Sequence, residues 1–304
     1  MSKDSEDLRA RLKKSREART AMLARFGSVP MSILRPMQDR ALSERMFIYQ
    51  HETPDRLANN QPRRAEKQKR LAEAGYKSSG SPSGREIGRG TLAASIMPAH
   101  LVAFFIKYYA APGQVYLDPF MGQGVRMQVA HALKLDYYGY DASEEFFNYI
   151  ESIRPLIDDQ TTQIKTYLGD SRTPDQIPDQ IGDFSFHSPP YWDLEDYGDE
   201  DAQLGKQSYP DFIDSMHDIA RAWLPKFKSG AWHIVNVGDF RKNGQFYSYH
   251  SDTIDAFKRA GWVHHDTWIL DQVVSGMAKA FAVSFNLKRM APRSHEYALV
   301  FKAP

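Results

Sequence analysis

Cysteine is absent from this chain of 304 residues. Without a thiol, the protein forms no disulfide bond, no thiolate zinc site and no cysteine nucleophile. The ten histidines are scattered without an HxxxH spacing, so we expect no metal site. Apolar runs of about 18 residues, which could cross a membrane, are also missing, and the N-terminus is too polar for a secretory signal. We therefore expect a soluble, cytoplasmic protein without a membrane partner.

Net charge is only +1, but its sign is unevenly distributed along the chain. Residues 1–90 contain 20 Lys and Arg against 11 Asp and Glu, whereas the remaining residues contain 19 against 27. The positive residues concentrate between Arg9 and Arg25 and again between Arg63 and Arg70. Clustered positive charge suits a polyanion such as DNA or RNA, although a solvated helix face has the same composition.

The pattern of the chain changes near residue 92. Residues 1–92 read as a basic N-terminal extension, helical over residues 5–26 and irregular over the Gly-, Ser- and charge-rich residues 52–92. Over residues 93–304, apolar runs of strand length alternate with segments of helix length, which is typical of an α/β domain. We predict a seven-stranded, mostly parallel sheet, with strands at residues 114–118, 137–141, 163–168, 183–187, 231–237, 262–270 and 296–302. Helices are expected at residues 98–110, 124–134, 143–154, 208–226 and 251–260.

A glycine-rich turn follows the first strand in the sequence QVYLDPFMGQG. Gly122 and Gly124 let the backbone approach a ligand at the carboxyl edge of the sheet. Met127 stands where a dinucleotide fingerprint has its third glycine, which disfavours NAD. Asp141 follows the second strand and could accept both hydroxyls of a ribose, and Asp170 follows the third and could accept an adenine amino group. Each acid alone is typical of a helix cap. Together with Asp118 at the end of the first strand, they place acids at three successive strand ends, which favours a nucleoside-type cofactor.

The sequence SPPYW follows the fourth strand and therefore lies on the same edge of the sheet. Pro189 and Pro190 fix the backbone and remove two N–H donors, which leaves carbonyl oxygens facing outward. Ser188 Oγ and the Pro189 carbonyl could accept the two N–H bonds of an exocyclic amine, while Tyr191 stacks on the planar base. An isolated PPY tripeptide is typical of a packed turn, and its place after the glycine motif favours the catalytic interpretation.

Together and in this order, DPFMGQG and SPPYW resemble the motifs of the amino-group DNA methyltransferases, which form N4-methylcytosine or N6-methyladenine from S-adenosylmethionine. The resemblance covers residues 93–304 and implies a Rossmann-like class I methyltransferase fold. The family usually has GSGT where this chain has GQGV, so one hydroxyl near the cofactor is lost. The resemblance implies that the cofactor pocket is formed by Asp118, Phe120, Gly122, Gly124, Asp141, Asp170 and Ser171. It implies that catalysis depends on Ser188, Pro189, Pro190 and Tyr191.

Within that family, Ser before PPY is commoner in the N4-cytosine enzymes, so the resemblance favours a cytosine flipped out of double-stranded DNA, as in a restriction–modification system. The thiolate route to C5 methylation is closed because cysteine is absent. N6-adenine methylation is the first alternative, followed by an RNA or protein amide substrate. A DNA-binding protein on an inactive methyltransferase scaffold is a further alternative. Substrate contacts are predicted at Trp192, Lys279, Arg289 and Arg293, with residues 1–92 contacting phosphates.

Overall fold

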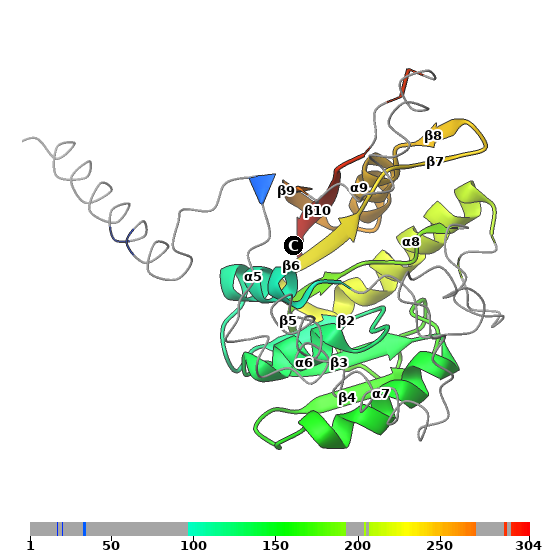
Figure 1. The fold of residues 1–304 in the computed structure, drawn as a ribbon. Helices are drawn as coiled ribbons and strands as arrows, with labels where there is room; N and C mark the ends of the chain where they lie inside the picture. The colour runs from blue at the N-terminus through cyan, green and yellow to red at the C-terminus, as the bar shows by residue number, and fades with distance from the viewer. Residues whose placement is uncertain are drawn as a thin grey trace, which may run out of the picture.

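A computed structural model describes residues 97–192, 207–271 and 293–304, together with positions 17, 20, 33, 34, 204, 289 and 290. Most of the predicted basic extension, the greater part of the loop after Trp192, and Lys279 lie outside the described residues. The described residues form an α/β sandwich around one central sheet (Figure 1).

The central sheet contains eight strands within the described residues, in the order β1-β9-β10-β6-β5-β2-β3-β4. Their bounds are Ile33–Leu34 for β1, Val115–Asp118 for β2, Asp136–Asp141 for β3, Ile164–Leu168 for β4, Gly182–His187 for β5, Phe227–Val237 for β6, Val263–Asp271 for β9 and His295–Lys302 for β10. All seven predicted strands are present, and β10 is antiparallel to both of its neighbours while the other pairings are parallel. The prediction of a mostly parallel Rossmann-like sheet is confirmed, and β1 is an additional short strand beside β9.

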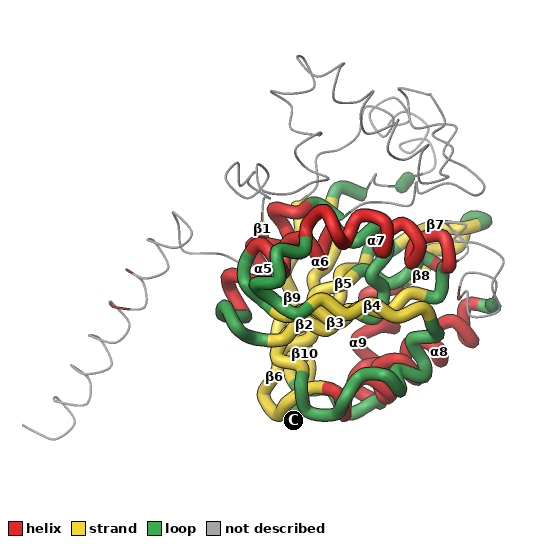
Figure 2. Tube along the Cα trace, turned by 90° about the horizontal axis from the view of Figure 1, so that it is seen from below, coloured by secondary structure: helices red, strands yellow, loops and turns green. Residues whose placement is uncertain are grey.

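Helices cover both faces of the sheet (Figure 2). Their bounds are Ala99–Tyr109 for α5, Val125–Ala132 for α6, Glu144–Ile157 for α7, Tyr209–Trp223 for α8 and Tyr249–Arg259 for α9. One hydrophobic cluster joins α5, α6 and α7 to the sheet, and a second joins α8 and α9 to the opposite face. Side chains alternate between the two clusters along a strand, as Ile234 and Val235 do in β6. Within the described residues, no helix has the length and hydropathy needed to cross a bilayer.

The direction of the strand order reverses between β2 and β5. The chain proceeds outward from β2 to β3 and β4 on one side, and from β5 to β6 on the other. β2 and β5 are direct neighbours through the pair Tyr116 and Phe184. Ligands of open α/β sheets bind in the crevice at the carboxyl ends of the strands at such a switch point. The glycine motif follows β2, and SPPYW follows β5.

Candidate functional site

The glycine turn between β2 and α6 has a backbone conformation that requires glycine. Gly122 and Gly124 have φ values of 50° and 74°, in the left-handed region that L side chains rarely adopt. A Cβ atom at position 124 would also lie 3.2 Å from Ile150 Cγ1 of α7. The Met121 N–H donates to the Tyr140 carbonyl at 2.8 Å, which fixes the turn against β3. The turn is therefore held against β3, and the packing of α7 leaves little room for a larger residue at position 124.

Asp141, at the end of β3, is tied directly to this turn. Its half-buried carboxylate accepts hydrogen bonds from the Gly122 N–H at 2.7 Å and the Ser143 N–H at 3.0 Å. Burial raises the pKa of Asp141 to about 6, although these two backbone donors act in the opposite direction. Each carboxylate oxygen keeps a further lone pair. Asp141 can therefore shape the glycine turn and accept donors from a ligand at the same time.

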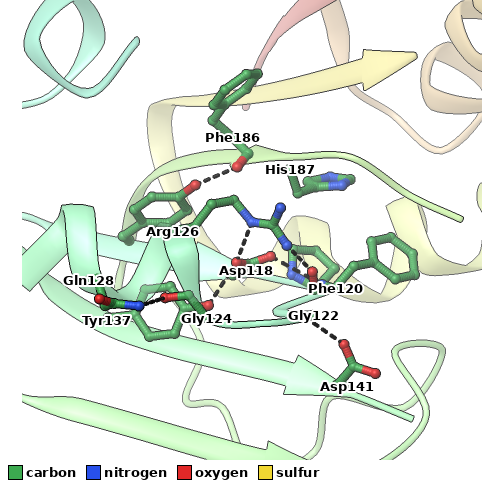
Figure 3. A network of polar contacts seen from close by, with 12 residues as sticks. Asp118, Phe120, Gly122, Gly124, Arg126, Gln128, Tyr137, Asp141, Phe186 and His187 are labelled. Carbon is green, nitrogen blue, oxygen red and sulfur yellow. Dashed lines mark hydrogen bonds and ion pairs between the residues drawn. The ribbon is translucent and has the colours of Figure 1, made fainter. Parts of the chain in front are cut away.

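Asp118, the last residue of β2, is fully buried beneath the turn (Figure 3). It accepts hydrogen bonds from Arg126 Nε and the Tyr137 hydroxyl, both at 2.7 Å, and from the Phe120 N–H at 3.1 Å. Arg126 also donates to the Phe120 carbonyl. Asp118 thus acts inside the protein as the anchor of a buried ion pair, and Arg126 is a residue of this region that sequence reasoning missed. Its position in the first turn of α6 gives no signal of burial in the sequence.

The loop after β4 is also attached to the glycine turn. Ser171 Oγ donates to the Pro119 carbonyl, and the Trp223 indole donates to the Ser171 carbonyl at 2.8 Å. Asp170 forms an ion pair with Arg172, whose Nη2 lies 2.6 Å from Asp170 Oδ2. The structure therefore brings the predicted residues Asp141, Asp170 and Ser171 around one turn. The contact between Asp170 and an adenine stays a prediction.

The residues of the second motif leave β5 and contact β6 and β10. Ser188 Oγ donates to the Asn236 carbonyl at 3.2 Å, while Pro189 is buried. The Tyr191 hydroxyl donates to Glu296 Oε1 at 3.2 Å, and Asn236 Nδ2 donates to Glu296 Oε2 at 2.8 Å. Burial, and then the negative charge of Glu296, raises the pKa of Tyr191 well above its usual value, so its phenol is a neutral donor. One carboxylate thus holds the ring directly and the serine through Asn236.

Sequence reasoning missed Asn236 and Glu296. Asn236 is 5% exposed, and its Oδ1 has no hydrogen-bond donor in the described structure. Glu296 follows Tyr191 by 105 residues, and only strand pairing brings the two together. The available signal was the polar start of the last predicted strand, HEYALVFK, because an antiparallel strand begins at the edge where its parallel neighbours end.

The two motifs meet through a ring contact between Phe120 and His187. The ring centroids lie 5.3 Å apart, and His187 directly precedes Ser188. His187 is buried, and its partner is another imidazole, because its Nε2 lies 2.6 Å from His233 Nε2. Burial lowers the pKa of His187 well below its usual value and that of His233 to about 3, so both rings are neutral.

Three of the four predicted substrate contacts can be placed. Trp192 is half-buried, and its indole donates to the Gln207 carbonyl at 2.8 Å. Arg293 lies near the second motif, since its positive charge partly offsets the rise in the pKa of Tyr191. Arg289 is exposed, with a φ of 52°. Lys279 lies outside the described residues, so these contacts to substrate stay predictions.

Asp239, just after β6, has a structural partner at the start of α9. Asp239 Oδ1 accepts from the His250 N–H at 3.1 Å and lies 2.7 Å from His250 Nδ1. It therefore fixes the start of α9. Among the residues that the structure describes, no three His, Asp or Glu side chains are grouped as a metal site would require.

A family model for DNA methylases, N6_N4_Mtase, matches residues 45–152. This range begins upstream of the predicted domain boundary at residue 92, contains the glycine turn and Asp141, and ends before Ser188. No curated protein matches the chain.

Solved structures with a similar fold include TrmN from Thermus thermophilus (15% identity, TM-score 0.46), where the match covers 69% of this chain and 50% of that chain. The chain thus spans about half the length of TrmN. Geranyl diphosphate C-methyltransferase from Streptomyces coelicolor has 14% identity and a TM-score of 0.45, with coverage of 67% and 80%. A TehB-like methyltransferase from Corynebacterium glutamicum has 15% identity and a TM-score of 0.43, with coverage of 80% and 97%. Over residues 45–152, which contain the glycine motif but not SPPYW, the chain is similar to the amino-group DNA methyltransferases, a family whose methyl donor is S-adenosylmethionine.

Proposed function

We propose that this protein transfers a methyl group from S-adenosylmethionine to the exocyclic amine of a base flipped out of double-stranded DNA, and that the base is cytosine. The observation that carries the proposal is the contact between Phe120 of the glycine turn and His187, which directly precedes Ser188. It places a turn suited to a nucleoside cofactor beside a loop suited to an amine.

The residues of the glycine turn fit the cofactor. Asp141 is a half-buried carboxyl whose raised pKa shows that its two backbone donors do not compensate for its burial. The hydroxyls of a ribose would supply two more donors to the ionised form. Gly122 leaves room for a ligand, because the nearest atom to a Cβ built there is 3.9 Å away. When bound, the cofactor supplies an electrophilic methyl group.

Ser188 and Pro189 act on the amine. The lone pair of an exocyclic amine is delocalised into the base, which makes the nitrogen a poor nucleophile. Because Ser188 Oγ gives its own proton to the Asn236 carbonyl, its lone pairs remain free to accept one amine N–H, and the Pro189 carbonyl accepts the other. These two bonds favour a pyramidal nitrogen with a localised lone pair. With its lone pair localised, the nitrogen would accept the methyl group that the bound cofactor supplies, with the donor sulfur as the leaving group, and would lose a proton to water.

Tyr191 sets the plane of the base by stacking. An amine inside a duplex is out of reach of any such loop, so the base has to leave the stack. Glu296 holds both Tyr191 and Asn236, and it therefore positions the stacking ring and the amine acceptor relative to each other. Much of the catalysis is then positioning of the reacting atoms.

Nucleoside mass spectrometry of DNA incubated with the protein and S-adenosylmethionine tests the proposal. We expect N4-methylcytosine, because of the serine before PPY, and N6-methyladenine would identify the adenine alternative. Tyr191→Ala and Pro189→Ala should lose most transfer activity and keep the thermal unfolding midpoint. Full activity in either variant would overturn the assigned roles, and failure to bind S-adenosylmethionine in calorimetry would favour a non-catalytic scaffold.

A further inference from the structure

A short β-hairpin projects from the end of β6 (Figure 1). It lies on the same edge of the sheet as residues 188–192, which follow β5 and are called the catalytic loop below. Its strands are β7, Phe240–Lys242, and β8, Gln245–Tyr247. The turn residues Asn243 and Gly244 have φ values of 51° and 82°, the positive pair that a tight type I′ turn requires. A Cβ atom at Gly244 would meet no atom within 4 Å, so the tip is open.

The root of the hairpin is continuous with the catalytic loop. Phe240 and Tyr247 stack on each other with centroids 5.1 Å apart, and Trp192 packs against both, at 6.0 and 5.2 Å. Lys242 Nζ lies 4.6 Å from the centroid of the Trp192 ring, on the same side of the hairpin. The hairpin is therefore anchored beside the residue that follows the SPPY tetrapeptide.

The outer part of the hairpin carries cations and an exposed aromatic ring. Arg241 Cζ lies 4.8 Å from the centroid of the Phe246 ring. Phe246 is 48% exposed, and within the described residues only Leu168 and Val263 are comparable exposed large apolar side chains. The hairpin sequence FRKNGQFY contains no acidic residue. Core packing explains Phe240 and Tyr247, but it does not explain Phe246, whose ring is exposed on the other face of the hairpin.

We infer that the β7–β8 hairpin is a DNA-binding element that contacts the duplex beside the flipped base. Arg241 contacts a backbone phosphate, and Phe246 packs on a base that loses its stacking neighbour when the target leaves the helix. Base flipping costs a few kcal/mol of stacking and pairing, and an aromatic side chain placed on the exposed base recovers part of that loss. The inference rests on the proposed function, since it needs a duplex bound at the catalytic edge.

Equilibrium binding of a labelled duplex, measured over a range of salt concentrations, tests the inference in the full chain. For Arg241→Ala, we expect weaker binding and a slope of log affinity against log salt that is smaller by about 1. For Phe246→Ala, we expect about five- to hundredfold weaker binding with an unchanged salt slope. The matched controls are Arg221→Ala on the exposed side of α8 and Val263→Ala on β9, which should bind DNA as the wild type does.

Methyl transfer to the same DNA and calorimetry of S-adenosylmethionine binding separate the two possible failures. Unchanged cofactor binding in both hairpin variants would show that they fold. Wild-type DNA affinity and salt slope in both variants, with methyl transfer intact, would overturn the role of the hairpin and leave the proposed function standing. Weaker DNA binding in both, from a wild type that transfers no methyl group, would support the hairpin and overturn the proposed function.

Discussion

Replacement of Glu296 by Gln tests whether the link between Tyr191 and Asn236 serves catalysis. The carboxylate accepts one hydrogen bond from each, at 3.2 and 2.8 Å, whereas an amide offers one acceptor atom and turns a donor toward the other partner. A hydrogen bond to a charged acceptor contributes about 1.5–3 kcal/mol. The longer bond to Tyr191 argues for the lower half of that range, and a loss of about 1.5–2.2 kcal/mol corresponds to a rate about 10 to 50 times slower.

Single-turnover methyl transfer at saturating DNA is the assay. We expect the loss in the rate of transfer and not in the affinity for S-adenosylmethionine, because Asp141 and the glycine turn are held by β3 and α6 rather than by β10. Tyr191→Phe keeps the stacking ring and removes the donor, so it should lose rate to a similar extent. Because Tyr191→Phe and Glu296→Gln break the same contact, the double variant should be less impaired than the product of the two single effects.

Glu151→Gln is the matched control. Glu151 is a half-buried carboxylate that also has two partners, Thr166 and Arg154, but it lies on α7 away from the catalytic loop. It should keep the wild-type rate. A Glu296→Gln protein with a normal unfolding midpoint and a wild-type rate would refute the reasoning, and so would strictly multiplicative effects in the double variant.

The remaining predictions concern the buried groups around the site. Asp118→Asn leaves Arg126 buried without its charge partner and should lower the free energy of unfolding in urea by about 3–5 kcal/mol. Combining Asp118→Asn with Arg126→Met should recover part of that stability. A loss of stability below about 1 kcal/mol in Asp118→Asn would contradict the anchoring role. Ribose hydroxyls favour the ionised form of Asp141, so the affinity for the cofactor should fall as the pH decreases through about 6 and should be about tenfold lower at pH 5. Asp141→Asn should remove this pH dependence. A wild-type Kd that stays constant over this pH range would disprove the role of Asp141. Burial lowers the pKa values of His187 and His233, so the stability that the two neutral rings contribute is complete above about pH 6.5 and is lost below it. The free energy of unfolding should fall by up to about 2.7 kcal/mol per pH unit in that range. His233→Phe should reduce this dependence of the free energy of unfolding on pH, measured by urea unfolding at several pH values.

The seven strands and five helices were predictable because each element carries its own pattern. A strand buried on both faces is a short apolar run, and the segments between such runs have the length of crossover helices. The positions of the two motifs follow from this alternation, since each begins where a strand ends. The two-residue strand β1 has no such pattern, because its pairing with β9 depends on tertiary contact.

The polar partners inside the site could not be predicted in the same way. Arg126 lies in α6, whose sequence VRMQVAHA suggests a helix with its polar side chains in solvent. Almost every side chain of that helix is buried instead. The pairing of His187 with His233 depends on the register between β5 and β6, which places His233 opposite Ser185. Register is a property of the assembled sheet, and a shift of one residue would send each side chain to the opposite face.

The direction of the last strand decides which charge reaches the catalytic loop. Residues 272–294 connect β9 to β10, and a connection of that length permits either a parallel or an antiparallel strand. A parallel β10 would bring Lys302 to the edge where Ser188 lies, whereas the antiparallel strand brings Glu296 there. A lysine offers only donors, so it could not accept from Tyr191 and Asn236 as the carboxylate does. The antiparallel pairing of β10 is therefore a condition for this arrangement, because it supplies the acceptor that Tyr191 and Asn236 share.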